Sequence, residues 1–347
     1  MTLRELLTRL AAERSLPADL PARAAAVLAT PRRDQPPWYL HLLVATGSWI
    51  AALLLLVFTA MLGVISSSAS AILIGAIVVG AAIGLRYLVD RVTWLAQVPL
   101  ALSTVGALLI FGGVFALGNF ADNTSLNRAI GALCVVELLL IAVYPDPLRR
   151  LLSALVLAVA LCWLPLLNGL PLIAQFVVVT LGWAVALLWR GESWMARHEA
   201  LLRPVAYGLV FGLFGGLLLL LTEPSPPRMV TSLGLAAALA VVVWSLTLAA
   251  GPPTRLATMA GALLLLIPAW QTPGILAAAL VLVLGFSRGN RLLLGLGALF
   301  LAGFIAFFYY SLATTLLVKS YALIGAGLLL LALRAGLLHA AARSGLL

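Results

Sequence analysis

Apolar residues fill long blocks along most of this chain, and short polar segments separate the blocks. A helix needs about 20 apolar residues to cross the hydrocarbon core of a bilayer. The pattern predicts an all-α fold, a polytopic transmembrane helix bundle of about 12 spans. The predicted spans are 40–65, 69–88, 94–118, 128–144, 150–167, 171–189, 204–221, 229–250, 256–270, 274–287, 292–310 and 313–334.

The first 36 residues follow a different pattern. Four leucines, Leu3, Leu6, Leu7 and Leu10, recur at the spacing of one helical face. No short apolar core with a cleavage site opens the chain, so we expect no secretory signal peptide. Residues 1–36 are predicted to form a cytoplasmic amphipathic helical tail, and residues 37–347 the transmembrane helical domain. The tail lies either on the anionic membrane surface or as a helical hairpin on the protein.

Composition supports lipid as the solvent of this chain. Hydrophobic residues make up 64% of the sequence and charged residues only 9%, whereas soluble domains carry about 25% charged residues. Polar segments between the predicted spans are short, and no soluble domain is expected beyond the tail. Any chemistry therefore belongs to the bilayer or to its two surfaces.

The net charge of +10 does not indicate a nucleic-acid partner, because the cations stand singly or in pairs between apolar blocks. They follow the positive-inside pattern instead. With 12 spans and a cytoplasmic N-terminus, 18 of the 21 cations fall on the cytoplasmic side, and three, Arg128, Arg228 and Lys319, fall opposite. The chain is thus predicted to be N-in and C-in, as a multi-pass protein of the bacterial inner membrane.

Glu137 is the acid that stands out at bilayer depth, near the middle of the fourth predicted span. A charge at the centre of a spanning helix costs about 2.5–3.5 kcal/mol on insertion scales. The carboxyl must therefore stay neutral or face a cation or water, and we expect it to face the bundle interior and to touch a polar group. It is either a proton or cation site in a translocation path or a structural carboxyl that bonds a neighbouring helix.

Lys319, the single lysine, shares one helical face with Ser311 and Thr315, because the three recur every four residues. Its ammonium group either reaches the non-cytoplasmic surface of the inner membrane or pairs with Glu137. The pair would form in the outer half of the membrane if spans four and twelve are adjacent.

Other polar groups in the spans are expected to make interhelical hydrogen bonds; they are Gln97, Ser103, Thr104, Asn119 and Gln175. Two runs of small residues, 80–84 and 208–216, allow close helix packing within the chain or between two copies.

No motif for a metal, a cofactor or a catalytic nucleophile is found. The sequence lacks a phosphate-binding glycine loop, HExxH, CxxC and GxSxG, its three histidines are dispersed, and its two cysteines lie in apolar blocks. We expect no cofactor, no metal and no enzymatic activity. An intramembrane lipid-modifying enzyme would need convergent polar groups, which only the loop 190–203 offers, and salt-bridged anchoring explains that loop better.

Two stretches carry a family resemblance. Pro37-Trp38-Tyr39-Leu40 with Trp49-Ile50-Ala51-Ala52-Leu53, and Phe308-Tyr309-Tyr310-x-Leu312 with Thr315-Leu316-Leu317-x-Lys319-Ser320, resemble an uncharacterised bacterial multi-pass inner-membrane family, a domain of unknown function, number 4401. The resemblance implies a protein that acts beside other small membrane proteins. It also adds Tyr310 and Ser320 to a candidate polar site with Glu137, Thr315 and Lys319.

Two functions remain open from the sequence. The first is a secondary transporter or permease-like protein that uses the intramembrane carboxyl of Glu137. The second is a membrane scaffold or subunit of a membrane complex without transport of its own. The expected partners are the lipid bilayer and either other small inner-membrane proteins or further copies of the chain, with no nucleic acid.

Overall fold

The structure, a computed structural model, describes most of the predicted membrane domain. The main described ranges are 46–51, 67–88, 97–118, 123–191, 197–222, 229–248 and 272–311, with isolated residues in 53–61, at 195 and in 324–335. These ranges are almost entirely helical and contain no strand. The tail 1–36 and the predicted span 256–270 lie outside the described residues, as do most of 40–65 and 313–334.

Nine helices can be delimited within these ranges. They are α4 (Ser68–Leu88), α5 (Gln97–Ala116), α6 (Asn123–Val143), α7 (Pro147–Leu167), α8 (Pro171–Arg190), α10 (Glu199–Thr222), α11 (Met229–Leu246), α14 (Pro273–Ser287) and α15 (Arg291–Ser311). Eight of them are long and apolar enough to cross a membrane, and α14 is an apolar helix of 15 residues. Each of the nine coincides with a predicted span, which confirms an all-helical chain with several membrane-length helices.

Two helices begin five residues earlier than the sequence predicts. α6 begins at Asn123 rather than at 128, because polar side chains of its first turns bond the end of α7: Asn127 and Asn168 exchange hydrogen bonds of 2.7 and 3.1 Å. α10 begins at Glu199 rather than at 204, and Pro204 lies inside it. The predicted loop 190–203 is therefore shorter than expected.

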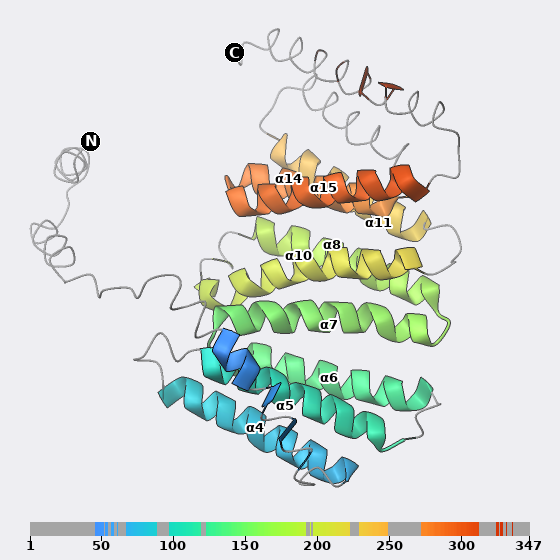
Figure 1. The fold of residues 1–347 in the computed structure, drawn as a ribbon. Coiled ribbons are helices and arrows are strands. Elements are labelled where there is room, and N and C mark those ends of the chain that lie inside the picture. The colour runs from blue at the N-terminus through green and yellow to red at the C-terminus, as the bar shows by residue number, and fades with distance from the viewer. Residues whose placement is uncertain are drawn as a thin grey trace, which may run out of the picture.

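The helices pack chiefly on their neighbours in sequence. α4 packs on α5, α5 on α6, α6 on α7, α7 on α8 and α10, α8 on α11, α11 on α14 and α14 on α15. Figure 1 shows the result, a stack of roughly antiparallel helices that runs from α4 at one edge to α14 and α15 at the other. The largest apolar core lies between α7 and α15 and includes Phe214, Leu217 and Val281.

Glycines set the closest helix contacts, as the small-residue run 208–216 predicts. A side chain at Gly208 would collide with the Leu151 carbonyl, one at Gly212 with the Ala158 methyl, and one at Gly216 would come within 2.6 Å of the Cys162 sulfur. This face of α10 is therefore filled by α7. By contrast, an added Cβ at Gly80 or Gly84 of α4 would meet no atom of the described residues within 4 Å.

The predicted interhelical hydrogen bonds are confirmed in part. The Oε1 of Gln175 on α8 accepts from the N–H and the hydroxyl of Thr231 on α11, both at 3.4 Å. Ser103 and Thr104 instead donate to the Leu100 carbonyl of their own helix, at 2.8 and 3.0 Å. A hydroxyl in an apolar helix satisfies itself this way when no partner helix offers an acceptor.

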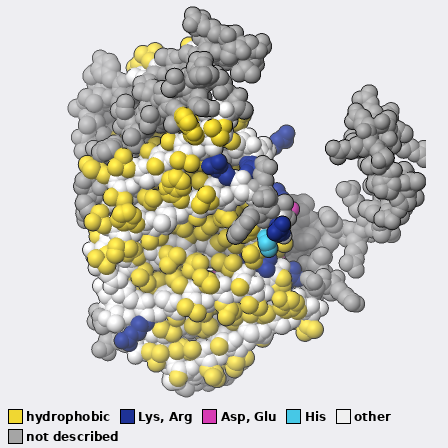
Figure 2. Space-filling view, turned by 180° about the vertical axis from the view of Figure 1, so that it is seen from behind, with side chains coloured by type: hydrophobic (Ala, Val, Ile, Leu, Met, Phe, Trp, Pro, Cys, Tyr) yellow, Lys and Arg dark blue, Asp and Glu magenta, His cyan; other side chains and the backbone are white. Residues whose placement is uncertain are grey.

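The described arginines gather at one end of the helix stack, which we call the arginine-rich end. Hydrogen bonds tie its turns together: Tyr87 reaches the Val143 carbonyl, Arg150 reaches Ala200, and Arg288 reaches the Arg190 carbonyl. Eight of the nine described arginines lie there, and Arg128 lies at the other end. Figure 2 shows a broad hydrophobic flank, with most of the visible basic side chains along one side.

Candidate functional site

Glu137 of α6 forms an ion pair with Arg149 of α7. The Nη2 of Arg149 donates to the Oε1 of Glu137 at 3.0 Å, and the two side chains are only 2% and 4% exposed. The Glu137 side chain thus faces the interior of the helix bundle and touches a polar group, as expected. The neighbouring Val135 and Leu138 are 69% and 61% exposed and cover the outer surface of α6.

The pair lies nearer one membrane surface than the sequence indicates. Because α6 spans 123–143, Glu137 stands six residues from its last residue, or about 9 Å along the axis. This corrects the expected position near the middle of the span. Arg149 stands in the first turn of α7, and its long side chain reaches back toward Glu137.

A local sequence signal places Arg149 there. Asp146 caps α7: its backbone is extended, with φ −108° and ψ 128°, and its Oδ2 accepts from the Arg149 N–H at 3.1 Å. Pro147 follows at the first helical position, where its missing N–H costs no bond. The predicted span 150–167 begins one residue after Arg149 and so leaves Arg149 outside the helix. The Asp146-Pro147 pair is the signal that moves the helix start upstream.

A second carboxylate completes the cluster. Arg86, in the last turn of α4, lies 3.6 Å from the Oδ1 of Asp146, with side chains 14% and 16% exposed. We call Arg86, Glu137, Asp146 and Arg149 the buried ion cluster. It joins three helices at the arginine-rich end and places two acids against two cations.

Several polar atoms around this cluster have no hydrogen-bond partner within the described ranges. They are the Oε2 of Glu137, the Nε of Arg149, the hydroxyl of Tyr144 and the hydroxyl of Ser153. All four residues are 3% exposed or less. Burial, with a smaller contribution from the Asp146 charge, raises the pKa of Tyr144, so this phenol stays neutral. Buried polar atoms are almost always satisfied, which makes this group a candidate for a bound proton, water or polar ligand.

Two carbonyls at the end of α6 accept from side chains. Pro145 lacks the N–H that would bond the Ile141 carbonyl four residues earlier, and the carbonyl of Val143, the last residue of α6, has no partner within the helix. The Nε of Arg150 donates to the Ile141 carbonyl at 3.2 Å, and the Tyr87 hydroxyl donates to the Val143 carbonyl at 3.1 Å. The turn between α6 and α7 is therefore held by groups from its own helices and from α4.

The cluster allows one kind of chemistry, an exchange of partners. A proton on Glu137 would cancel its attraction for Arg149, and Asp146 offers another carboxylate within one helical turn. No group of three or more metal-ligating side chains occurs in the described part of the chain. The arrangement thus gives Arg149 two neighbouring carboxylates, those of Glu137 and Asp146.

The other predicted site residues do not join this cluster where the structure describes them. Tyr310 lies in the last turn of α15, a helix that packs mainly on α14, and its side chain is 82% exposed. It stacks edge-on against Tyr309, with ring centroids 5.5 Å apart. Thr315, Lys319 and Ser320 lie outside the described residues. The cation found beside Glu137 is Arg149, which the sequence analysis did not single out.

Eight apolar helices of membrane length make this a multi-pass membrane protein. Residues 37–340 match the profile of the family described as domain of unknown function (DUF4401), and the chain belongs to that family. No curated protein matches the chain significantly. No solved structure does so either.

Proposed function

We propose that this protein is a permease-like protein of the bacterial inner membrane in which protonation of Glu137 controls the position of Arg149. The observation that carries the proposal is the buried ion pair at 3.0 Å with one carboxylate oxygen left without a partner. Ionisable groups inside membrane helices mark ion and proton pathways. A helix hairpin with only a structural role does not need a buried ion pair, because apolar residues of similar volume stabilise the packing equally well.

The proposed step is a partner exchange. A proton binds the free Oε2 of Glu137, the attraction between Glu137 and Arg149 is lost, and the guanidinium moves toward Asp146. Arg86 then loses part of its own attraction to Asp146, which lies 3.6 Å away. Because Arg86 lies in the last turn of α4 and Arg149 in the first turn of α7, the exchange would shift these helices relative to α6. Release of the proton reverses the sequence.

The arginine-rich end is proposed to face the cytoplasm. Cytoplasmic loops carry an excess of arginine and lysine in membrane proteins, and eight of the nine described arginines lie at this end. The buried ion cluster would then open toward the cell interior. No enzymatic step and no cofactor is part of this proposal.

Proton flux into liposomes tests the proposal. The full chain is reconstituted with an internal pH dye, and a potassium gradient with valinomycin drives protons inward. We expect protein-dependent acidification that Glu137→Gln reduces to the rate of empty liposomes and Glu137→Asp partly retains. Equal fluxes for the natural chain and Glu137→Gln, with both proteins folded, would contradict the role of Glu137.

A scaffold is the second candidate, and the helix arrangement favours it. Helices that pack on sequence neighbours in a row (Figure 1) leave long apolar flanks, including the open face of α4 at Gly80 and Gly84. Such flanks can hold other small membrane proteins or a second copy. Stable co-purification of a neighbouring membrane protein, without any protein-dependent proton flux, would favour this role over transport.

A further inference from the structure

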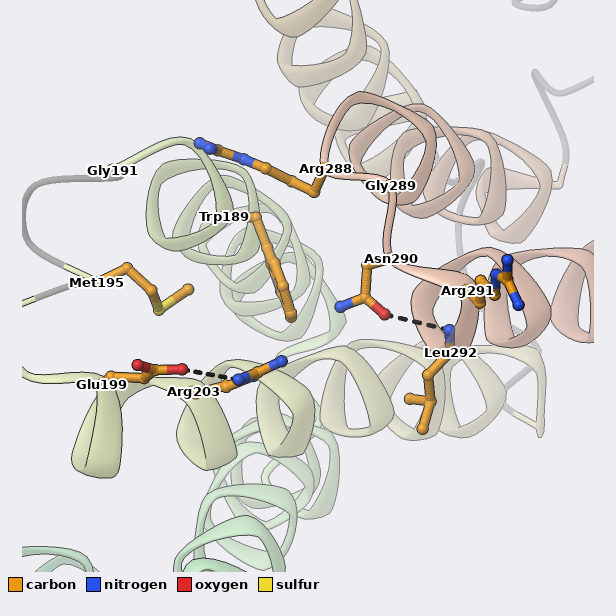
Figure 3. A pocket seen from close by; sticks show the side chains of 10 residues that line it. All are labelled: Trp189, Gly191, Met195, Glu199, Arg203, Arg288, Gly289, Asn290, Arg291 and Leu292. Carbon is orange, nitrogen blue, oxygen red and sulfur yellow. Dashed lines mark hydrogen bonds and ion pairs between the residues drawn. The ribbon is translucent and has the colours of Figure 1, made fainter. Parts of the chain in front are cut away.

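A second polar site lies at the arginine-rich end, away from the buried ion cluster. It is a pocket of about 600 Å³. Its walls come from the end of α8, the start of α10 and the turn between α14 and α15. The lining residues are Trp189, Gly191, Met195, Glu199, Arg203, Arg288, Gly289, Asn290, Arg291 and Leu292, and Figure 3 shows them around a common opening.

The pocket lining carries a net positive charge, since it contains three arginines and one glutamate. Arg203 bonds Glu199 at 2.7 Å, an exposed pair within α10. Arg291 has no acidic partner among the described residues, and it is solvent-exposed at the pocket rim. The lining therefore keeps a surplus of positive charge after its internal pair is counted.

Trp189 adds an unused donor at the pocket. Its side chain is 6% exposed, and its indole N–H has no acceptor in the described part of the chain. Figure 3 places its ring between Met195 and Asn290, in the middle of the lining residues. The edge contact with Tyr207, at 5.0 Å between ring centroids, fixes the ring. A buried indole N–H usually finds a partner, so an acceptor from outside the chain is expected here.

The frame of the pocket is rigid. Asn290 donates to the Tyr207 hydroxyl at 2.6 Å, and its Oδ1 accepts from the N–H groups of Leu292 and Leu293, which caps α15. Gly289 adopts a positive φ of 59° and allows the tight turn before that cap. Arg291 and Arg288 are thus carried on a fixed turn that faces the start of α10.

We propose that this pocket binds a phosphate group, presented by an anionic phospholipid headgroup or by a soluble phosphate. Guanidinium and indole N–H groups are donors, and a phosphate offers several strong acceptor oxygens with negative charge. Basic pockets between helix ends at a membrane surface suit lipid headgroups. Leu292, which lines the pocket and is 58% exposed, would contact an acyl chain.

Native mass spectrometry of the full chain tests the lipid source. The protein is purified in a neutral detergent and titrated with phosphatidylglycerol or with phosphatidylcholine. We expect phosphatidylglycerol to bind at least five-fold more tightly than phosphatidylcholine. Arg291→Gln, which removes the arginine without an acidic partner, and Trp189→Phe, which removes only the indole N–H, should each weaken phosphatidylglycerol binding several-fold. The matched control is Arg128→Gln, at the opposite end, which should change nothing.

A parallel arm with radioactive inorganic phosphate separates the two sources. Retention of phosphatidylglycerol with no phosphate binding in equilibrium dialysis assigns the pocket to a lipid headgroup. Phosphate binding that competes with the lipid and is lost in Arg291→Gln assigns it to a soluble phosphate. The proposal is overturned if the natural chain binds neither phosphatidylglycerol nor phosphate. It is also overturned if Arg291→Gln and Arg128→Gln change binding equally while both variants keep the unfolding temperature of the natural chain.

Discussion

Arg150 and Pro204 are related through one carbonyl group. Pro204 lies inside α10 and has no N–H for the Ala200 carbonyl four residues earlier. The Nη1 of Arg150 on α7 donates to that carbonyl at 2.9 Å, while its Nε serves the Ile141 carbonyl, which Pro145 leaves open. One guanidinium therefore donates to two carbonyls that prolines leave without an N–H partner, and these two bonds connect α7 to α6 and to α10.

This relationship predicts a specific double-mutant cycle. Arg150→Gln should destabilise the fold by about 1–3 kcal/mol, because two carbonyls lose their donor. Pro204→Ala restores an N–H for the Ala200 carbonyl, so the loss on Arg150→Gln should be smaller in the Pro204→Ala background. Thermal unfolding in detergent measures both differences. Strict additivity would show that the carbonyl does not couple the two residues.

The buried ion pair predicts that a single variant loses much more stability than a double variant that replaces both partners. Glu137→Gln removes the carboxylate that pairs with the buried Arg149 guanidinium, and breaking a buried pair should cost about 3–5 kcal/mol. The double variant Glu137→Leu with Arg149→Met should be close to the natural protein in stability, because an apolar pair of similar volume replaces the ions.

The exposed pair Glu199 and Arg203 serves as the comparison for that variant series. Its side chains are 59% and 56% exposed, and exposed ion pairs contribute little. Glu199→Gln should therefore leave the unfolding temperature nearly unchanged. A destabilisation as large as that of Glu137→Gln would mean that burial does not govern the effect.

Tyr144 predicts a dependence on alkaline pH. Burial raises its pKa above the ordinary value, so the unfolded chain loses the phenol proton first as pH rises. The stability that the neutral phenol provides is complete below about pH 10 and declines above it. Tyr144→Phe should remove this part of the decline and should not destabilise the protein at neutral pH, since the hydroxyl has no partner among the described residues. Unfolding curves at pH 8 and pH 11 provide the measurement.

Glycine positions separate packed from open helix faces. Gly212→Leu should destabilise the fold by about 1–3 kcal/mol or prevent folding, because the added side chain meets Ala158 on α7. Gly84→Leu should be tolerated, because the space beside it is open. Equal effects of the two substitutions on expression and on the unfolding temperature would contradict the helix packing.

Much of the helix layout follows from the apolar blocks alone, since lipid requires membrane-length helices. Helix ends did not, because polar residues such as Asn123 and Glu199 extend a helix beyond its apolar block when side chains or solvent satisfy them. Glu137 was recognisable as a single acid in an apolar block. Its partner was not, because Arg149 is one of many arginines near helix ends, and only the register between α6 and α7 brings it inward.

The polar pocket was also beyond sequence analysis. Its arginines come from segments about 90 residues apart, near Arg203 and Arg291, and adjacency of distant helix ends is not encoded in a local pattern. The loop 190–203 did carry a signal, since tryptophan, glutamate and arginine are crowded there. That signal favoured surface anchoring and did not indicate a pocket between helix ends.

The succession of helix contacts from α4 to α15 bears on how the chain is made. α4 with α5, α6 with α7 and α14 with α15 are consecutive helices in close contact, whereas α10 packs mainly on α7 across α8. Hairpins such as α6 with α7 can therefore dock as soon as both helices have left the translocon. Contacts between segments close in sequence form quickly and need little search. A ribosome pause or truncation after α7 should therefore leave the Glu137–Arg149 pair already assembled in the lipid.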